Sequence, residues 1–568
     1  MSNRLLLTRT LLVLFLATAG AAQAPTEPTA AAAAARMQAQ DPAGAARILE
    51  AVTAREPANA RAWRLLGVAY QRSQEIDKAL AAYRKSLEIE PGAPQLLYNL
   101  GTAFALKQDA NAAFDWLGRA KATRKLDMTQ IETDADLSAL KTDARFRALL
   151  PTPEDFAQPL VEPVHVIREW DGQAAGDQFG WIARGIGDVD RDGVPDIVAS
   201  APTKNIGGAA AGRVYVYSTH TGKRLWSVDG HPGDQLGTGI EAAGDTNHDG
   251  VPDVVASAPG AGKAYLYSGT DGRTLLTLTA EKTSDNFGQH VSGVGDVNGD
   301  GYADVIVGAP GNGAGGEGAG RAYVYSGRDG RVLLTLTGAA AHDAFGSAVA
   351  GSHGKKGSFL IVGAPGAGPR HTGRTYVYKG LSSKAAFVID ADDTGNALGA
   401  MFLSTIGDVN GDGVPDIYAS DFSNAAKGPS TGRIYVHSGS DGRRLLTLTG
   451  ETAGEGFGIG PAAAGDVDGD GYDDLIVGAW QYAGAAVSGG RAYLYSGKDG
   501  TLLKTYTCRT PGDTFGFDAV GLGDVDGDGT IDFLITSAWS GIHGFHSGRL
   551  FIISSGVSAA HGRGGGRR

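Results

Sequence analysis

The sequence has a single cysteine, and only 20% of its residues are charged. Cys508 alone cannot form an internal disulfide, so packing, hydrogen bonds or metal ions must hold the fold together. The net charge of −12 is the wrong sign for a nucleic-acid partner. After residue 24 no stretch is apolar for long enough to cross a bilayer, so we expect no transmembrane segment in the mature chain.

The chain begins with the layout of a secretory signal peptide, predicted over residues 1–24. Arg4 and Arg9 precede a short apolar run, and small residues follow it. We therefore expect an exported protein that is periplasmic, on the cell surface or secreted. Residues 25–40 form an Ala-rich linker or a degenerate first helix, and residues 557–568 are expected to form a disordered basic tail.

An acidic loop of nine residues occurs six times, for example DVDGDGYDD at 466–474. Asp or Asn oxygens fall at positions one, three, five and nine, and glycine at position six allows a sharp turn. Position twelve is Ala, Val or Ile where an EF-hand needs Glu, so each loop leads into a strand and not into a helix. Oxygen donors without His or Cys favour Ca²⁺, and we predict up to six structural calcium ions.

We predict that side chains at positions one, three, five and nine, with the backbone carbonyl of position seven, bind each ion. Without a cation the crowded carboxylates would repel one another, by about 4 kcal/mol for a pair about 4 Å apart at an effective dielectric of about 20. The predicted ligands are Asp188, Asp190, Asp192, Val194 and Asp196; Asp245, Asn247, Asp249, Val251 and Asp253; Asp296, Asn298, Asp300, Tyr302 and Asp304; Asp408, Asn410, Asp412, Val414 and Asp416; Asp466, Asp468, Asp470, Tyr472 and Asp474; and Asp524, Asp526, Asp528, Thr530 and Asp532.

The acidic loops belong to a larger unit that occurs seven times over residues 164–556. Each unit has a Phe-Gly or Leu-Gly pair, the loop, a β-branched run, a Gly-rich stretch, a Tyr-rich strand and an LLTLTG-type strand. Seven four-stranded units predict a seven-bladed β-propeller. The fourth unit has no carboxylate in its loop, where Lys355 and Lys356 stand instead, so we expect that blade to be metal-free.

The Phe-Gly pairs, the acidic loops and the Gly-Ala-Pro endings at 308–310 and 363–365 occur together and in order. In these features the region resembles the FG-GAP repeats of the integrin α-subunit propeller and its bacterial relatives. The last unit lacks its LLTLTG-type strand, whereas residues 164–170 stand before the first Phe-Gly pair in its place. We therefore predict that this N-terminal strand completes the last blade.

Residues 41–150 have helical periodicity. Seven positions match the 34-residue tetratricopeptide pattern, namely Trp63, Leu66, Gly67, Tyr70, Ala79, Tyr83 and Pro91, and the segment resembles that family. A second repeat follows, a degenerate one precedes, and residues 137–150 are predicted to form one capping helix. Residues 151–163 contain prolines and are predicted to be a linker. The predicted fold is thus multidomain: an all-α helical repeat stack, then an all-β propeller.

The sequence has no catalytic motif in a fitting context, so we expect a protein that is not an enzyme. The favoured function is an exported calcium-binding interaction or adhesion protein, with a monomeric propeller and a protein partner at the cell envelope or outside. The alternative is a glycan-binding, lectin-like propeller or a non-catalytic relative of a polysaccharide-acting enzyme. Trp480, Tyr482 and Trp539, which follow blade strands, are the candidate sugar platforms.

Overall fold

The computed structural model describes residues 29–352, 358–460 and 463–558. The predicted signal peptide, Lys355, Lys356 and most of the basic tail lie outside this range. The chain divides into two compact units: one contains the helices up to Thr123 and Asp134–Leu149, and the other contains Arg124–Thr133 and the chain from Leu150 onward. No helix within the described residues is long and apolar enough to cross a membrane.

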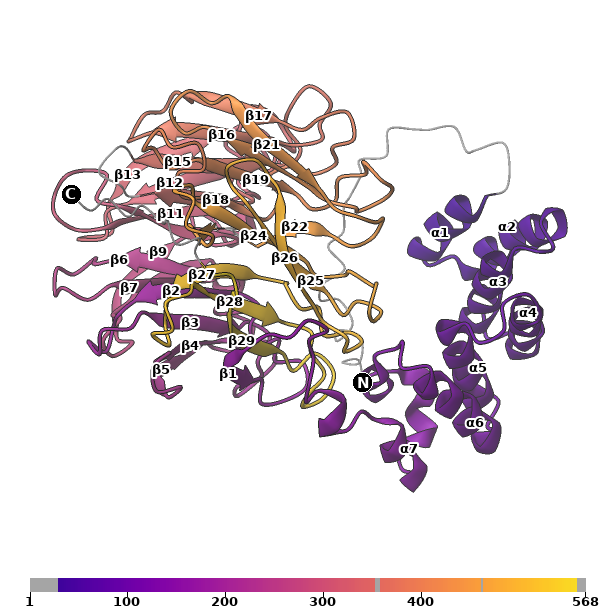
Figure 1. The fold of residues 1–568 in the computed structure, drawn as a ribbon. Helices are drawn as coiled ribbons and strands as arrows, with labels where there is room; N and C mark the ends of the chain where they lie inside the picture. The colour runs from indigo at the N-terminus through magenta and orange to yellow at the C-terminus, as the bar shows by residue number, and fades with distance from the viewer. Residues whose placement is uncertain (1–28, 353–357, 461–462, 559–568) are drawn as a thin grey trace, which may run out of the picture. The chain divides into compact units, whose positions relative to one another are not determined.

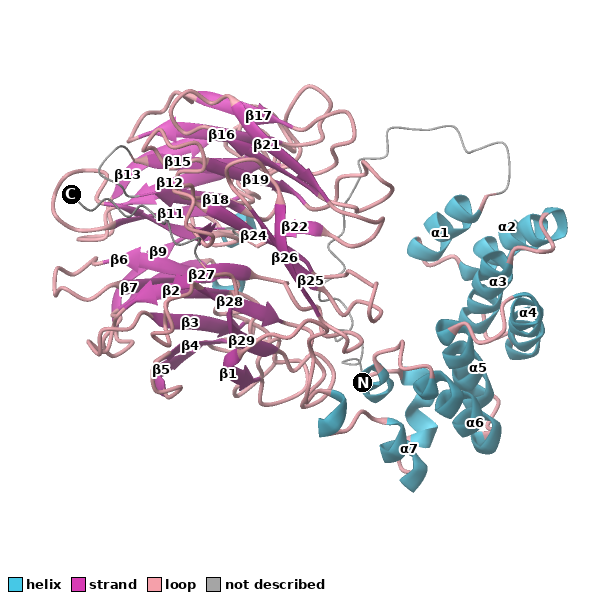
Figure 2. Cartoon of the chain, viewed as in Figure 1, coloured by secondary structure: helices cyan, strands magenta, loops and turns pink. Residues whose placement is uncertain are grey.

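The first unit is a stack of paired antiparallel helices (Figure 2). Side chains of Thr29, Asp41, Asn59 and Asp109 each accept a backbone N–H at the start of a helix, which explains where four of the helices begin. This arrangement confirms the predicted tetratricopeptide stack, with an Ala-rich first helix. The helices are α1 (Ala30–Gln38), α2 (Pro42–Arg55), α3 (Ala60–Arg72), α4 (Ile76–Ile89), α5 (Pro94–Leu106) and α6 (Ala110–Ala122).

Glycines set the closest approach of the helices within each repeat. A Cβ on Gly67 of α3 would lie 2.3 Å from the Tyr83 ring of α4, and one on Gly101 of α5 would lie 2.6 Å from Leu117 of α6. Tyr83 is fully buried, and its hydroxyl donates to Gln71 at 2.9 Å. The glycines of the repeat pattern are therefore packing residues.

The predicted single capping helix over 137–150 is wrong. A 3₁₀ helix, η2 (Ala135–Leu140), and a short α-helix, α7 (Ala144–Leu149), occupy this stretch. The Asp143 carboxylate between them accepts the backbone N–H of Arg145 at 2.9 Å, which caps a new helix and ends the previous one. The preceding 3₁₀ helix, η1 (Met128–Glu132), belongs to the propeller unit, where Glu132 accepts the N–H of Phe545 at 3.2 Å.

The second unit is a ring of seven antiparallel sheets, which confirms the predicted seven-bladed propeller (Figure 1). In each blade the second strand is fully buried. The first strands of blades 1 to 5 contact one another in turn, and so do those of blades 6, 7 and 1. The inner strand of blade 6 is in two pieces. The strands are, in blade 1, β2 (Ala183–Gly187), β3 (Asp196–Ala201), β4 (Arg213–Tyr217) and β5 (Arg224–Asp229); in blade 2, β6 (Ile240–Gly244), β7 (Asp253–Ala258), β8 (Lys263–Tyr267) and β9 (Thr274–Thr279); in blade 3, β10 (Val291–Gly295), β11 (Asp304–Ala309), β12 (Arg321–Tyr325) and β13 (Val332–Thr337); in blade 4, β14 (Val349–Ser352), β15 (Phe359–Ala364), β16 (Arg374–Lys379) and β17 (Phe387–Asp390); in blade 5, β18 (Leu403–Thr405), β19 (Ile417–Asp421), β20 (Arg433–His437) and β21 (Arg444–Thr449); in blade 6, β22 (Phe457–Ile459), β23 (Ala463–Gly465), β24 (Asp474–Ala479), β25 (Arg491–Tyr495) and β26 (Leu502–Thr507); and in blade 7, β27 (Ala519–Gly523), β28 (Asp532–Ser537), β29 (Arg549–Ser554) and β1 (Val166–Asp171).

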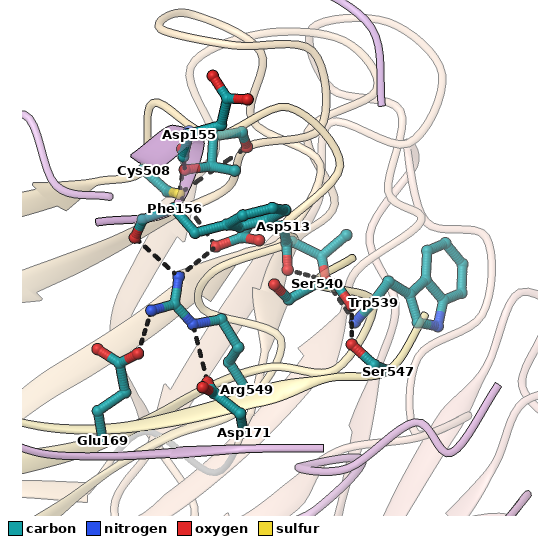
Figure 3. Close-up of polar contacts among 12 residues, drawn as sticks. Asp155, Phe156, Glu169, Asp171, Cys508, Asp513, Trp539, Ser540, Ser547 and Arg549 are labelled. Carbon is teal, nitrogen blue, oxygen red and sulfur yellow. Dashed lines mark hydrogen bonds and ion pairs between the residues drawn. The ribbon is translucent and has the colours of Figure 1, made fainter. Parts of the chain in front are cut away.

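The N-terminal strand closes the ring, as predicted. Strand β1 pairs antiparallel with β29, with Val166 opposite Ile553 and Asp171 opposite Arg549. The guanidinium of Arg549, only 2% exposed, contacts Glu169 and lies 3.2 Å from Asp171 (Figure 3). It also donates to the carbonyl of Phe156 at 3.2 Å. One buried cation thus joins the two ends of the propeller.

Residues 151–163, predicted as a linker, pack against the propeller. After η3 (Pro153–Asp155), Val161 donates its N–H to the carbonyl of Thr507 at 2.8 Å. The Glu162 carboxylate accepts the N–H of Thr507 at 2.6 Å and the Thr505 hydroxyl at 3.0 Å. The segment therefore continues the outer edge of blade 6, where β26 presents unpaired backbone groups.

Candidate metal loops

Each acidic loop joins the end of the first strand of a blade to the start of the second. All six loops therefore lie at the same end of their blades. In blade 6, Gly471 at the sixth position has φ of 91°, a left-handed conformation that favours glycine. The Asp466 carboxylate accepts the N–H groups of Asp470 and Gly471, both at 3.0 Å. These bonds fold the loop around its first carboxylate.

The ninth-position Asp is buried in every loop. In blade 6, Asp474 accepts the N–H of Val467 at 2.8 Å and that of Gly497, in the turn between the third and fourth strands, at 3.0 Å. The bond to the second loop residue occurs in all six loops, at 2.8–3.0 Å. The ninth Asp therefore anchors the loop to its own blade, a role that the sequence pattern did not indicate.

Burial raises the pKa of these ninth-position carboxyls. The pKa rises to about 6 for Asp196, Asp304 and Asp474, and to about 7 for Asp416 and Asp532. Desolvation is the largest cause, and neighbouring carboxylates of the same loop add to it. At neutral pH the negative charge of these carboxylates therefore needs a nearby positive charge, which a divalent cation would supply.

Three loops bring three carboxylates to one point. In blade 1 oxygens of Asp188, Asp190 and Asp196 lie within 4.8 Å of one another, and the same positions converge in blades 6 and 7. The fifth-position carboxylate is not in these groups. In blade 6, Asp470 accepts the N–H of Tyr472 at 3.1 Å, so its side chain turns back onto the loop.

The loops of blades 2, 3 and 5 carry Asn at the third position and differ in their polar contacts. The amide of Asn410 donates to Asp416 at 3.0 Å, and those of Asn247 and Asn298 donate to their ninth-position Asp at 3.2 and 3.4 Å. An amide N–H thus replaces a carboxylate beside the ninth Asp. This lowers the repulsion within the loop and also lowers the negative charge offered to a cation.

One acidic residue that sequence reasoning missed is Asp473, at the eighth position of the blade 6 loop. Its carboxylate accepts the N–H of Asp408 in the blade 5 loop at 2.7 Å, and its N–H donates to the Asp408 carbonyl at 3.1 Å. The other copies have Pro, Ala or Ile at this position, so the extra carboxylate was the available signal. It joins two neighbouring loops.

The residues present fit a calcium ion. The donors are oxygens, three carboxylates converge in each of three loops, and Asp532 Oδ1 is buried with no hydrogen-bond partner among the described residues. A carboxylate oxygen buried without a partner is costly, and a cation is the natural partner for it.

The helical unit offers a different kind of site. A cavity of about 650 Å³ lies between α2 and α4, with Trp63, Leu66 and Tyr70 of α3 along it. Glu50 and Lys78 in its lining are exposed: Glu50 accepts the Tyr70 hydroxyl at 2.5 Å, and the Lys78 ammonium lies 5.4 Å from the Tyr70 ring. The lining is mainly apolar, in contrast to the acidic loops of the propeller.

Comparisons with known proteins agree with this architecture. The FG-GAP repeat matches residues 179–217, 239–273 and 287–325, an FG-GAP-like repeat matches 408–477, and a tetratricopeptide repeat matches 30–94. The chain therefore carries a tetratricopeptide stack followed by a seven-bladed propeller with FG-GAP repeats.

Integrin α chains are among its relatives. Integrin alpha-6 of Gallus gallus is 32% identical over 154 residues, which are 25% of this chain and 14% of the relative. Integrin alpha-E of Mus musculus is 33% identical over 168 residues, with 25% and 14% covered. Integrin alpha-4 of Xenopus laevis is 26% identical over 250 residues, with 40% and 23% covered. The chain thus spans less than a quarter of the length of these relatives.

Proposed function

We propose that this chain is an exported, non-catalytic protein whose propeller binds calcium and engages a protein partner in adhesion or at the cell envelope. The likeness to integrin α chains supports an interaction or adhesion role, and the N-terminal pattern supports export. The observation that carries the calcium proposal is the convergence of three carboxylates in each of three loops.

In each loop the ion would be held by side chains at positions one, three, five and nine and by the carbonyl of position seven. The fifth side chain would have to turn from its own loop toward the ion, and the third-position Asn would have to present its amide oxygen. When bound, calcium neutralises the crowded carboxylates and stiffens the loop. The ninth Asp transmits that stiffness to the blade, because it is bonded to the loop and, in blades 1, 2, 3, 5 and 6, to the turn after the third strand.

Metal content and partner capture test the two halves of this proposal separately. We expect the full chain, stripped of metal and titrated calorimetrically with Ca²⁺, to bind up to six ions. We also expect affinity capture from the envelope of the source cells to retain one saturable partner that excess free chain displaces. An absence of calcium binding contradicts the first half, and an absence of any competed partner contradicts the second.

A further inference from the structure

A cluster of charged and polar residues lies at the centre of the propeller, away from the acidic loops. Arg184 is on β2, the inner strand of blade 1, and its Nε donates to Glu241 on β6 of blade 2 at 2.9 Å. Its Nη1 donates to Asp518, which directly precedes β27 of blade 7. His290 directly precedes β10 of blade 3, and the charge of Arg184 acts on it. Residues that lie on, or directly before, the inner strands of four consecutive blades thus contribute to one cluster.

Both carboxylates of this cluster are paired with the Arg184 guanidinium, but the hydrogen bonds of the cluster are not complete. Asp518 is 1% exposed, and its Oδ2 accepts from Arg184 and from the N–H of Ala183, at 3.2 Å. Its Oδ1 is buried and, although the N–H of Ala519 is near, lacks a hydrogen bond of good geometry to any described residue. The same holds for both ring nitrogens of His290, which lie near the backbone of Val349.

His290 is neutral at pH 7, because burial and the neighbouring guanidinium lower its pKa to about 4. A neutral imidazole has one N–H donor and one acceptor nitrogen. The cluster therefore offers unused acceptors and one unused donor in a buried position.

An aromatic wall adjoins the cluster through Phe517, the residue before Asp518. The Phe517 ring lies 4.9 Å from Trp181 and 5.5 Å from Trp480, and Trp480 lies 4.7 Å from Trp539. The Trp181 indole donates to the Thr238 carbonyl at 3.2 Å. The indole N–H groups of Trp480 and Trp539 are buried and have no acceptor within the described part of the chain, although both side chains are partly exposed.

The unused hydrogen-bonding groups and the aromatic rings indicate which class of ligand this site can bind. Unused donors and unused acceptors together match hydroxyl groups, which donate and accept, and aromatic rings match the C–H faces of a sugar ring. An ammonium group would leave both indole N–H groups without an acceptor. An anion would meet two carboxylates against one guanidinium. Within the described residues, metal-ligating side chains converge in threes only in the acidic loops of blades 1, 6 and 7.

We propose that the central cluster of Arg184, Glu241, His290 and Asp518, with the wall of Trp480, Phe517 and Trp539, binds a sugar residue of a glycan. Asp518 Oδ1 and His290 hydrogen-bond its hydroxyls, and the two indole N–H groups donate to its oxygens. Tyr482, the third platform expected from the sequence, is not part of this wall; the Arg491 guanidinium lies 3.7 Å from its ring.

The test uses the full calcium-saturated chain on a microarray of defined oligosaccharides, followed by calorimetric titration with the free oligosaccharide of the strongest spot. We expect micromolar to millimolar binding. His290→Phe removes both ring nitrogens, and Trp480→Phe removes the indole N–H together with part of the ring; none of these polar atoms has a partner among the described residues. Each change should therefore weaken binding at least tenfold and lower Tm by less than about 5 °C. The control is Trp226→Phe on the outer strand β5, whose indole donates to Gly269 at 2.7 Å; it should bind as the wild type does.

Three results would overturn the proposal. The first is no binding to any oligosaccharide by the folded chain, and the second is unchanged affinity in both variants. The third is a fall in Tm of more than about 5 °C in both, because it would mean that these atoms serve the fold. Calcium binding is read in the same calorimeter, so loss of the calcium proposal and loss of the glycan proposal are distinguishable.

Discussion

The helical unit and the propeller use glycine and charge in different ways. In the helical unit each helix packs mainly on its neighbour in sequence, and Gly67 and Gly101 allow close helix contacts. In the propeller, glycines such as Gly471 turn loops, and β1 pairs with a strand near the other end of the chain. The helical stack is therefore built from local contacts, whereas the ring depends on one long-range closure and on compensation of its acidic loops.

The largest effect that separates the two units should come from calcium removal. Six independent sites with extracellular-type affinities, at calcium tenfold above the dissociation constant, would together contribute about 8 kcal/mol. We expect excess chelator to lower the melting transition of the propeller and leave that of the helices unchanged, as measured by scanning calorimetry. Added Ca²⁺ should restore it. An unchanged melting temperature of the propeller in chelator would contradict the prediction that calcium stabilises the propeller and not the helices.

The Arg549→Met substitution tests how strongly the ion pairs of Arg549 hold strand β1 against β29. It leaves Glu169 and Asp171 without their buried cation, so we expect a loss of roughly 3–5 kcal/mol of propeller stability and faster hydrogen exchange in β1. The matched control is Arg213→Met, at the same strand position in blade 1. Its partner Asp229 is 41% exposed, so that change should cost at most about 1 kcal/mol. Equal losses in both variants would contradict a special role for the closure.

Gly67→Ala should affect the helical unit alone. The new Cβ would meet the buried Tyr83 ring, and we expect a loss of roughly 1–3 kcal/mol in the helical transition. Gly118→Ala in α6 is the control: its Cβ would meet nothing within 4 Å, so higher helix propensity should stabilise the unit by up to about 1 kcal/mol. We therefore predict that Gly67→Ala lowers the stability of the helical unit and that Gly118→Ala raises it. Urea unfolding followed by far-UV circular dichroism measures both changes.

The smallest effect that we expect is a difference in calcium affinity between acidic loops of the propeller. Asp468→Asn converts the blade 6 loop to the type found in blades 3 and 5, and we expect less than about tenfold weaker calcium binding there. Asn298→Asp makes the reverse change in blade 3 and should strengthen binding by a similar factor, as measured by titration calorimetry. The same direction of change in both variants would count against the charge argument.

The repeat pattern was sufficient to predict seven blades, their closure by an N-terminal strand and the helical repeats, because each rests on periodicity. It did not reveal that residues 151–163 extend blade 6, since Glu162 binds Thr507 only after folding. It also did not reveal the cluster of Arg184, Asp518 and His290. These residues come from different repeats and break no local pattern, so only the ring brings them together.

The most direct test of the central claim is the number of calcium ions bound by the intact chain, counted by native mass spectrometry at saturating Ca²⁺. The account predicts up to six ions, with one ion fewer after Asp466→Ala, which removes the carboxylate around which the blade 6 loop folds. A chain that binds no calcium, or that keeps the same number of ions after Asp466→Ala, would contradict it.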